Sequence, residues 1–256
     1  MEFRKIHLYK IITLLALMLA GFSYKVNADF IGVYAGVGTW NYTTSGQINN
    51  LGTDADFEDN FGLEDDFSGF AYIAVEHPFP LVPNIRLNHY ALKTTSNTTL
   101  TAASAFTFAG TNYTAGTNIE TELKWDESDS LLYYEFLDNI VSFDLGLGMK
   151  QINAELSVTT GGVSNILQIE ESLPIAYAML GAHIPGTGIS IIVEQTQSFL
   201  GDIEIVQNNS KISYEMGYMF GFEAGYRTST AKLDELPNIT GEVEFSGPFA
   251  NLLFHF

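Results

Sequence analysis

The sequence contains no cysteine, only 11 lysine and arginine residues against 30 acidic ones, and a charged fraction of 16%. Without cysteine, the chain has neither disulfides nor a cysteine for lipid attachment. A net charge of −19 argues against nucleic-acid binding, because a phosphate-binding protein needs a basic face. Hydrophobic residues at 46% and aromatic residues at 13% exclude a disordered chain. Frequent phenylalanine and tyrosine, together with 23 glycines, favour an all-β protein.

The first 28 residues predict an export signal. Arg4, Lys5 and Lys10 precede an apolar run over residues 11–21, and residues 26–28 (VNA) offer a small-residue cleavage site. This order is typical of a secretory signal peptide. The alternative is a membrane anchor, but the run is shorter than the ~20 apolar residues that cross the hydrocarbon. Cleavage after Ala28 leaves 228 residues with seven basic and 29 acidic side chains, a net charge of −22.

Beyond residue 28, the chain has neither an apolar stretch of membrane-helix length nor a helical stripe with a period of 3.6 residues. Hydrophobic residues instead alternate with small or charged ones. In residues 141–150 (VSFDLGLGMK), every odd position is large and apolar, and segments 31–40, 213–217 and 222–227 behave similarly. In a strand, the two sets lie on opposite faces. A soluble sandwich also alternates, but a bulky apolar face backed by glycine and charge favours a membrane barrel with lipid outside.

Turn residues and polar loops divide the mature chain into segments of strand length. We predict ten strands, at approximately residues 30–42, 67–77, 85–95, 120–137, 140–158, 165–184, 189–200, 211–220, 222–234 and 242–256. Short turns are expected at 78–84, 138–139, 185–188 and near Phe220-Gly221, long loops at 43–66 and 96–119, and intermediate loops at 159–164, 201–210 and 235–241. Short turns on one side and long loops on the other are typical of outer-membrane barrels. The predicted fold for residues 29–256 is therefore an all-β, transmembrane, antiparallel up-and-down β-barrel of about ten strands. Eight strands is the alternative if the region 201–241 is misinterpreted.

The last predicted strand ends on an alternating apolar face formed by Ala250, Leu252, Phe254 and Phe256. A terminal aromatic residue on such a strand resembles the signal that is read by the outer-membrane barrel assembly machinery. We therefore predict that these four residues form the assembly signal.

The whole mature chain resembles the small outer-membrane β-barrel proteins of Gram-negative bacteria, broadly the outer membrane protein W-like group and more closely a largely uncharacterised barrel family. The resemblance rests on residues 30–40 (FIGVYAGVGTW), 225–227 (GYR), 247–249 (GPF) and 255–256 (HF). It implies a barrel in the Gram-negative outer membrane. W-like proteins are associated with the passage of small hydrophobic molecules, although the loops of this chain do not match theirs.

Alternation also predicts which charged residues face the lumen. This predicted lumen network consists of Glu76, Arg86, Glu135, Asp144, Lys150, Glu194, Glu215, Glu223 and Arg227. Buried charges are tolerated when they are paired or hydrated. The network is expected either to fill a narrow barrel or to line a cation-preferring path or ligand pocket. Replacing Arg227 with alanine is expected to leave carboxylates unpaired.

Seven acidic residues lie within the thirteen positions 54–66 of the first long loop. Carboxylate oxygens suit calcium, and Asp54, Asp56, Glu58 and Asp65 are the candidate ligands. A calcium-loop register from Asp54 puts Asp59 where a glycine should stand, so a solvated extracellular loop is favoured over a metal site.

The sequence predicts no enzyme and no cofactor. It contains no Gly-x-Ser-x-Gly elbow and no histidine pair with metal-ligand spacing. Three histidines of the mature chain, His77, His183 and His255, map to the periplasmic end, and His89 maps to the lipid face. The expected partners are outer-membrane lipid, lipopolysaccharide and, during biogenesis, the barrel assembly machinery. The protein is expected to be a monomer. Two functions remain open: a narrow pore for small or hydrophobic solutes, and a non-conducting structural or surface-interaction barrel acting through extracellular loops.

Overall fold

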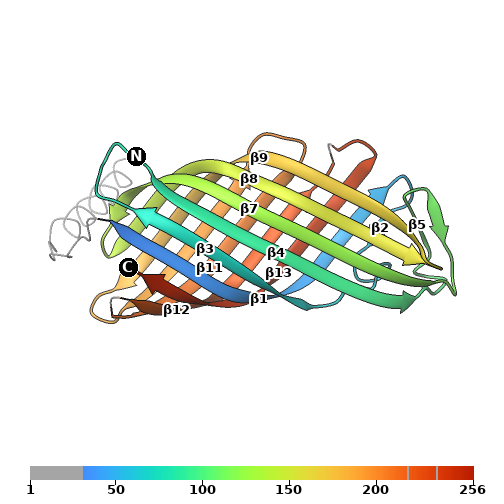
Figure 1. The fold of residues 1–256 in the computed structure, drawn as a ribbon, viewed down its shortest axis with the longest axis horizontal. Coiled ribbons are helices and arrows are strands. Elements are labelled where there is room, and N and C mark those ends of the chain that lie inside the picture. The colour runs from blue at the N-terminus through green and yellow to red at the C-terminus, as the bar shows by residue number, and fades with distance from the viewer. Residues whose placement is uncertain (1–30, 218, 235) are drawn as a thin grey trace, which may run out of the picture.

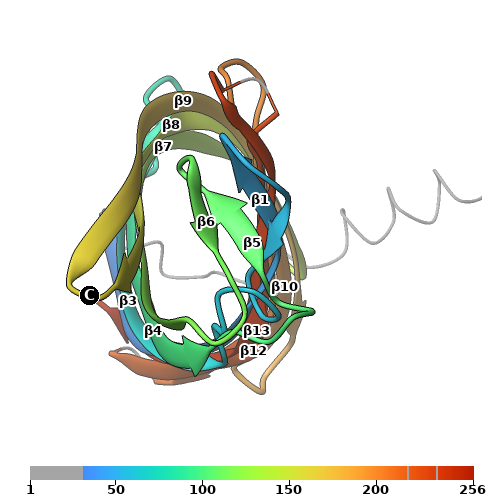
Figure 2. The same cartoon turned by 90° about the vertical axis from the view of Figure 1, so that its right-hand side faces the viewer.

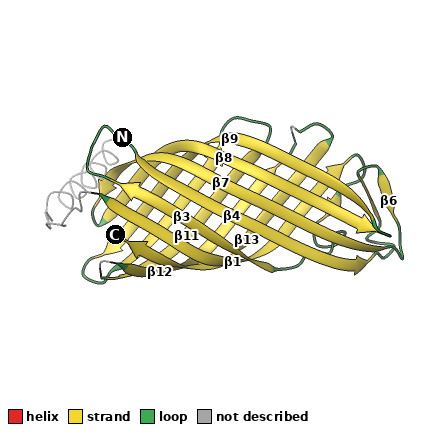
Figure 3. Cartoon of the chain, viewed as in Figure 1, coloured by secondary structure: helices red, strands yellow, loops and turns green. Residues whose placement is uncertain are grey.

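The computed structural model describes residues 31–217, 219–234 and 236–256 as thirteen strands (Figures 1 and 3). The predicted signal peptide at 1–28 and Phe30 of the opening motif lie outside the described residues. Within this described part of the chain, no helix is long and apolar enough to cross a membrane.

Ten long strands form a closed antiparallel up-and-down barrel, in which each strand pairs with the long strand before it and β13 pairs back with β1. This confirms the predicted fold class and the count of ten. The ten strands are β1 (Gly32–Asn50), β3 (Asp66–Glu76), β4 (Asn84–Thr99), β7 (Asn118–Asp138), β8 (Val141–Thr160), β9 (Val163–Ile184), β10 (Ile189–Ser198), β11 (Glu204–Met216), β12 (Phe220–Lys232) and β13 (Ile239–His255). Short turns lie at the end where β1 begins and β13 ends, here called the short-turn end, and longer loops lie at the opposite loop end (Figure 1).

Several predicted boundaries are wrong: besides the three described next, β4 includes residues 96–99 of a predicted loop, and the loop predicted at 159–164 is only the turn at 161–162. β1 continues to Asn50, so residues 43–50 belong to a strand and not to the first loop. β11 begins at Glu204 and absorbs most of the predicted loop 201–210. The turn before β12 precedes Phe220, which is itself the first residue of that strand. Residues 43–50 of β1 and 204–210 of β11 are polar because their outward side chains lie beyond the apolar belt. They therefore lack the alternation of apolar and polar residues that predicts a strand.

An apolar belt surrounds the outer wall near the short-turn end. The alternation of residues 141–149 places its large side chains outward, as predicted. Large apolar side chains of the belt are 40% to 62% exposed, including Val37, Ile73, Leu87, Leu132, Leu147, Leu180, Ile191, Val193, Ile212, Phe222 and Leu252. A contiguous exposed apolar surface of this extent requires a non-aqueous partner.

Toward the loop end, the two faces of the wall exchange character. On β8, the outward residues change from Leu147 and Met149 to Gln151 and Asn153, while the inward residues become Ile152, Ala154 and Leu156. The inward apolar side chains of this half belong to a buried cluster that also includes Trp40, Tyr42, Ile48, Leu123, Trp125, Val243 and Phe245. The loop half of the barrel is therefore stabilised like a water-soluble protein, with a hydrophobic core inside.

Two loop segments cover the loop end. The short strand β2 (Ala55–Asp56) pairs with β1, and β5 (Phe106–Phe108) pairs with β6 (Thr111–Tyr113) in a separate hairpin. Seen from the loop end, this hairpin lies across the barrel opening (Figure 2). The ring of Phe61 contacts the rings of Phe57, Phe106 and Phe108 at centroid distances of 5.0 to 5.8 Å. These aromatic contacts join the two loops into one lid.

Candidate functional site: the barrel lumen

All nine residues of the predicted lumen network occupy inward positions. Asp144, Lys150, Glu194, Glu223 and Arg227 are buried, Arg86 and Glu76 are partly buried, and Glu135 and Glu215 are exposed near the short-turn end. Three further charged residues are buried in the lumen, namely Glu127, Asp129 and Lys211. Glu127 and Asp129 occupy odd-numbered positions of β7, as Glu135 does, and Lys211 occupies an odd-numbered position of β11, as Glu215 does. The alternation of the sequence therefore also predicts that they face the lumen.

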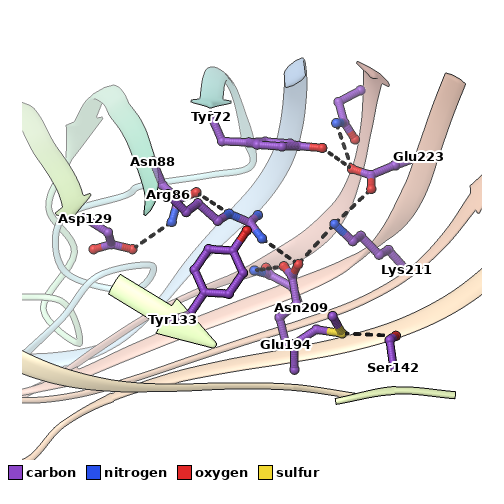
Figure 4. Close-up of polar contacts among 12 residues, drawn as sticks. Tyr72, Arg86, Asn88, Asp129, Tyr133, Ser142, Glu194, Asn209, Lys211 and Glu223 are labelled. Atoms are coloured by element: carbon purple, nitrogen blue, oxygen red, sulfur yellow. Dashed lines mark hydrogen bonds and ion pairs between the residues drawn. The ribbon is translucent and has the colours of Figure 1, made fainter. Parts of the chain in front are cut away.

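The first part of the network is centred on Glu194. Its carboxylate accepts a hydrogen bond from Arg86 at 2.8 Å and pairs with Lys211 at 3.2 Å. Lys211 also pairs with Glu223 at 2.9 Å, and Glu223 accepts hydrogen bonds from the Tyr72 hydroxyl and from Asn251 (Figure 4). Two carboxylates and two bases therefore neutralise one another across the lumen, which buried charges require.

The second part of the network is centred on Lys150, whose side chain has no exposed surface. Its ammonium group pairs with Asp129 at 2.7 Å and with Glu127, and it lies 3.4 Å from the Gln207 amide oxygen. The Asp129 carboxylate also accepts a hydrogen bond from Asn88, which in turn accepts one from Arg86. These contacts connect both parts of the network.

Arg227 corrects one expectation from the sequence, because no carboxylate of the described residues lies within ion-pair distance of its guanidinium. The group instead lies over four aromatic rings, 4.3 to 5.1 Å from their centroids, and Nε donates a hydrogen bond to Asn209 at 2.6 Å. Cation–π contact is worth about 2 kcal/mol or more where the cation is desolvated. The rings are those of Trp40, Phe70, Tyr90 and Phe249.

Side chains from all ten long strands together occupy the middle of the lumen. We call them the lumen plug: Trp40, Phe70, Tyr90, Asp129, Lys150, Leu173, Thr196, Gln207, Arg227 and Phe249. Each is at most 8% exposed, although each points into the barrel. A water-filled channel through the plug would leave its lining residues accessible, so the lumen is filled at this depth.

The histidines lie where the sequence predicted. His183 contacts the hydroxyls of Ser190 at 2.7 Å and Ser142 at 3.2 Å, and His255 stacks on Tyr34 at 4.0 Å, both at the short-turn end. His89 faces outward, and its Nδ1 lies 2.9 Å from the Ser128 hydroxyl. Among the described residues, no carboxylate contact to His89 accompanies this pair.

The candidate calcium ligands in the first loop make separate contacts. Asp54 accepts a hydrogen bond from Asn49, Asp56 accepts the backbone N–H groups of Glu58 and Asp59, and Asp65 accepts the Thr43 hydroxyl. In the described part of the chain, no three acidic or histidine side chains are grouped as a metal site.

The outer wall beyond the belt carries a shallow concavity of about 460 Å³ over β7, β8 and β9. Its lining is almost entirely polar: Asp126, Ser128, Gln151, Ile152, Asn153, Glu170, Glu171 and Ser172. Next to it, Lys124 pairs with Glu122 at 2.6 Å and with Glu155 at 3.1 Å, and Lys93 pairs with Glu122 at 2.7 Å. Hydrogen bonds from Lys124 and Lys93 lower the pKa of Glu122.

No family model and no curated protein matches the chain. Among solved structures, it is similar to Ail, the attachment invasion locus protein of Yersinia pestis, with 10% identity over 89% of this chain and 100% of Ail and a TM-score of 0.40. It is also similar to the translocator domain of autotransporter NalP from Neisseria meningitidis, with 11% identity, coverage of 99% and 98%, and a TM-score of 0.43. A third neighbour is the outer membrane protease OmpT from Escherichia coli, with 9% identity, coverage of 93% and 99%, and a TM-score of 0.40. These neighbours differ in function, and none of their activities is assigned to this chain.

Proposed function

We propose that this protein is a non-conducting β-barrel of the Gram-negative outer membrane that acts through its loop end. The observation that carries the proposal is the lumen plug, in which side chains from all ten long strands are at most 8% exposed. The hydrophobic cluster overlaps the plug at Trp40, Phe70, Tyr90, Leu173 and Phe249, and the rest of the cluster and the lid lie beyond the plug, toward the loop end. A solute crossing the barrel would have to displace all three.

The outer-membrane location is supported by the apolar belt together with the closed strand ladder, which leaves no unpaired sheet edge in lipid. The predicted signal peptide provides the route of export. In this orientation, the short-turn end faces the periplasm and the loop end faces outward. Ala250, Leu252, Phe254 and Phe256 continue the outward side of β13, where the proposed assembly signal would be read.

The loop half offers a surface for interaction with lipopolysaccharide or an external partner. The polar concavity begins directly beyond Met149 of the belt, at the depth of the lipid headgroups. Its carboxylates, amides and hydroxyls can hydrogen-bond to sugars, which suits the saccharide part of lipopolysaccharide. The extended wall holds this surface on rigid strands.

Single-channel recording in planar bilayers tests the closed lumen. The refolded protein is expected to give no unitary conductance, while a known porin in the same bilayers serves as the positive control. A triple variant that truncates Tyr90, Arg227 and Phe249 to alanine removes much of the plug and should increase leakage. Discrete conductance steps from the unmodified protein would overturn the proposal.

A narrow pathway for small hydrophobic solutes is the second candidate, and one observation favours it. The apolar interior of the loop half contains a cavity of about 20 Å³, lined entirely by apolar side chains that include Phe57, Leu123, Trp125, Leu167 and Val243. This volume holds little more than one water-sized group, so passage would require the lid and core to rearrange. Uptake of a fluorescent hydrophobic probe into proteoliposomes, above the rate of protein-free vesicles, would favour this function.

A further inference from the structure

Five acidic residues gather around the lumen at the short-turn end, and we call them the acidic mouth: Glu76, Glu135, Asp138, Asp144 and Glu215. The negative charges of four of them act on the Tyr34 hydroxyl, which places this tyrosine among them. Three of the acids also lie within electrostatic range of Asp144. The mouth thus gathers carboxyl groups around aromatic side chains, with Glu76 hydrogen-bonded to the Tyr133 hydroxyl at 2.7 Å and Glu135 to Asn84 at 3.0 Å.

A β-bulge turns one additional carboxylate, that of Asp138, into this mouth. Along β7, the register with β8 shifts between Glu135 and Leu137, so that Glu135 pairs with Asp144 and Asp138 pairs with Ser142. Glu135 and Asp138 are three positions apart, so in a regular strand they would face opposite sides of the wall. Because of the bulge, both pair with inward-facing residues of β8. Bulges commonly re-aim side chains at barrel rims and functional sites.

Asp144 is the part of the mouth that points to a ligand. It is 3% exposed, its Oδ1 is buried without a hydrogen-bond partner, and it stands directly opposite Glu135. Like charges directly opposite on neighbouring strands are destabilising. Burying a carboxylate oxygen that has no hydrogen-bond partner among the described residues is also costly, so a cation at this position would relieve both penalties.

The protein's own bases do not supply that cation. Arg86 is paired with Glu194 at 2.8 Å. His183 is held between two serine hydroxyls, and His77 accepts the backbone N–H of Phe79 through Nδ1. His255 is stacked on Tyr34.

We propose that the acidic mouth binds a linear organic polycation, such as a polyamine, from the periplasmic side. A metal ion fits less well, because the described acids and histidines include no group of three with metal-ligand spacing. Carboxylates spread over β3, β7, β8 and β11 instead match a ligand whose charges are separated along a chain. Tyr34 adds an aromatic face for an ammonium group.

Isothermal titration of the refolded protein in a zwitterionic detergent, with spermidine as the probe, tests this site. Saturable binding is expected, and Asp144→Asn should weaken it about tenfold because it removes the buried carboxyl group that would ionise against the bound cation. Glu135→Gln should act similarly and provides a second variant if Asp144→Asn fails to fold. Glu120→Gln, on the exposed outer wall at the loop end, is the matched control, because it removes the same charge far from the mouth. Folding of each variant is verified by its heat-modifiable electrophoretic shift.

Weakening by the two mouth variants, with unchanged affinity in the control, supports the site. Equal affinity in all variants would show only general attraction to an acidic protein, and the proposal would fail. The proposal would also be overturned if spermidine did not bind. It would be overturned as well if calcium bound saturably and only calcium binding, not spermidine binding, depended on Asp144. None of these outcomes bears on the closed lumen, which conductance tests separately.

Discussion

Replacing Lys150 with methionine tests whether the lumen network stabilises the barrel. The substitution keeps the length of the side chain but removes the ion-pair partner that Glu127 and Asp129 share among the described residues. The side chains of these two acids are 4% and 1% exposed. Breaking a buried ion pair by removing one partner typically costs about 3–5 kcal/mol. Since domains are stable by roughly 5–15 kcal/mol, the loss should be large.

Lys124 provides a matched control on the same pair of strands. It also bridges two glutamates, Glu122 and Glu155, but it lies on the outer wall and its side chain is 42% exposed. Water screens such pairs, so Lys124→Met should leave the unfolding midpoint almost unchanged. Burial is therefore the main variable that differs between the two substitutions.

Urea unfolding in lipid vesicles, followed by tryptophan fluorescence, measures both effects. Trp125 donates a hydrogen bond to Glu127 at 3.1 Å, so its emission reports directly on this part of the lumen. A triple variant, Lys150→Met with Glu127→Gln and Asp129→Asn, removes all three charges and should recover most of the lost stability. Equal losses for Lys150→Met and Lys124→Met, or no recovery in the triple variant, would refute the reasoning.

Other predictions concern the seam, the lid, the outer wall and the chain end. Gly38→Ala places a Cβ against the main chain of β13, so overpacking should lower the free energy of unfolding by about 1–3 kcal/mol in the same urea assay, whereas Gly69→Ala, which has open space, should not. Phe61→Ala removes the ring at the centre of the lid and should make the loop at residues 100–117 more sensitive to limited proteolysis, with the barrel intact. Hydrogen bonds from Lys124 and Lys93 lower the pKa of Glu122 in the folded protein. The stabilising contribution of Glu122 is therefore present above the pKa that this group has in the unfolded chain, and it disappears as the pH falls through the lower pKa of the folded protein. Lys124→Met should raise the pKa of Glu122, as measured by a carbon-13 NMR titration. Phe256→Ala should reduce the membrane-inserted fraction in cells while refolding in detergent stays normal, and equal insertion would contradict the proposed assembly signal.

The alternation along individual strands was enough to predict much of the lumen. Lys150 and Glu194 face inward because each shares parity with small or polar neighbours, a pattern with a period of two that needs no tertiary information. The same rule places Glu127 and Lys211 in the lumen. It failed in residues 43–50, where both faces of β1 contain polar residues and glycine.

Local alternation was enough to identify the barrel class, the number of strands and the side of the wall on which most charged residues lie, because side-chain direction in a strand is local. The contacts that those side chains make depend on the closed barrel. Arg86 and Glu194 are 108 positions apart, and the indole of Trp40 bonds to the carbonyl of Gly247 across the seam, 207 positions away. Such contacts depend on the register of every strand around the closed ladder, which no single segment encodes. For the same reason, the aromatic stacking of Arg227 and the hydrophobic interior of the loop half emerged only from the closed barrel.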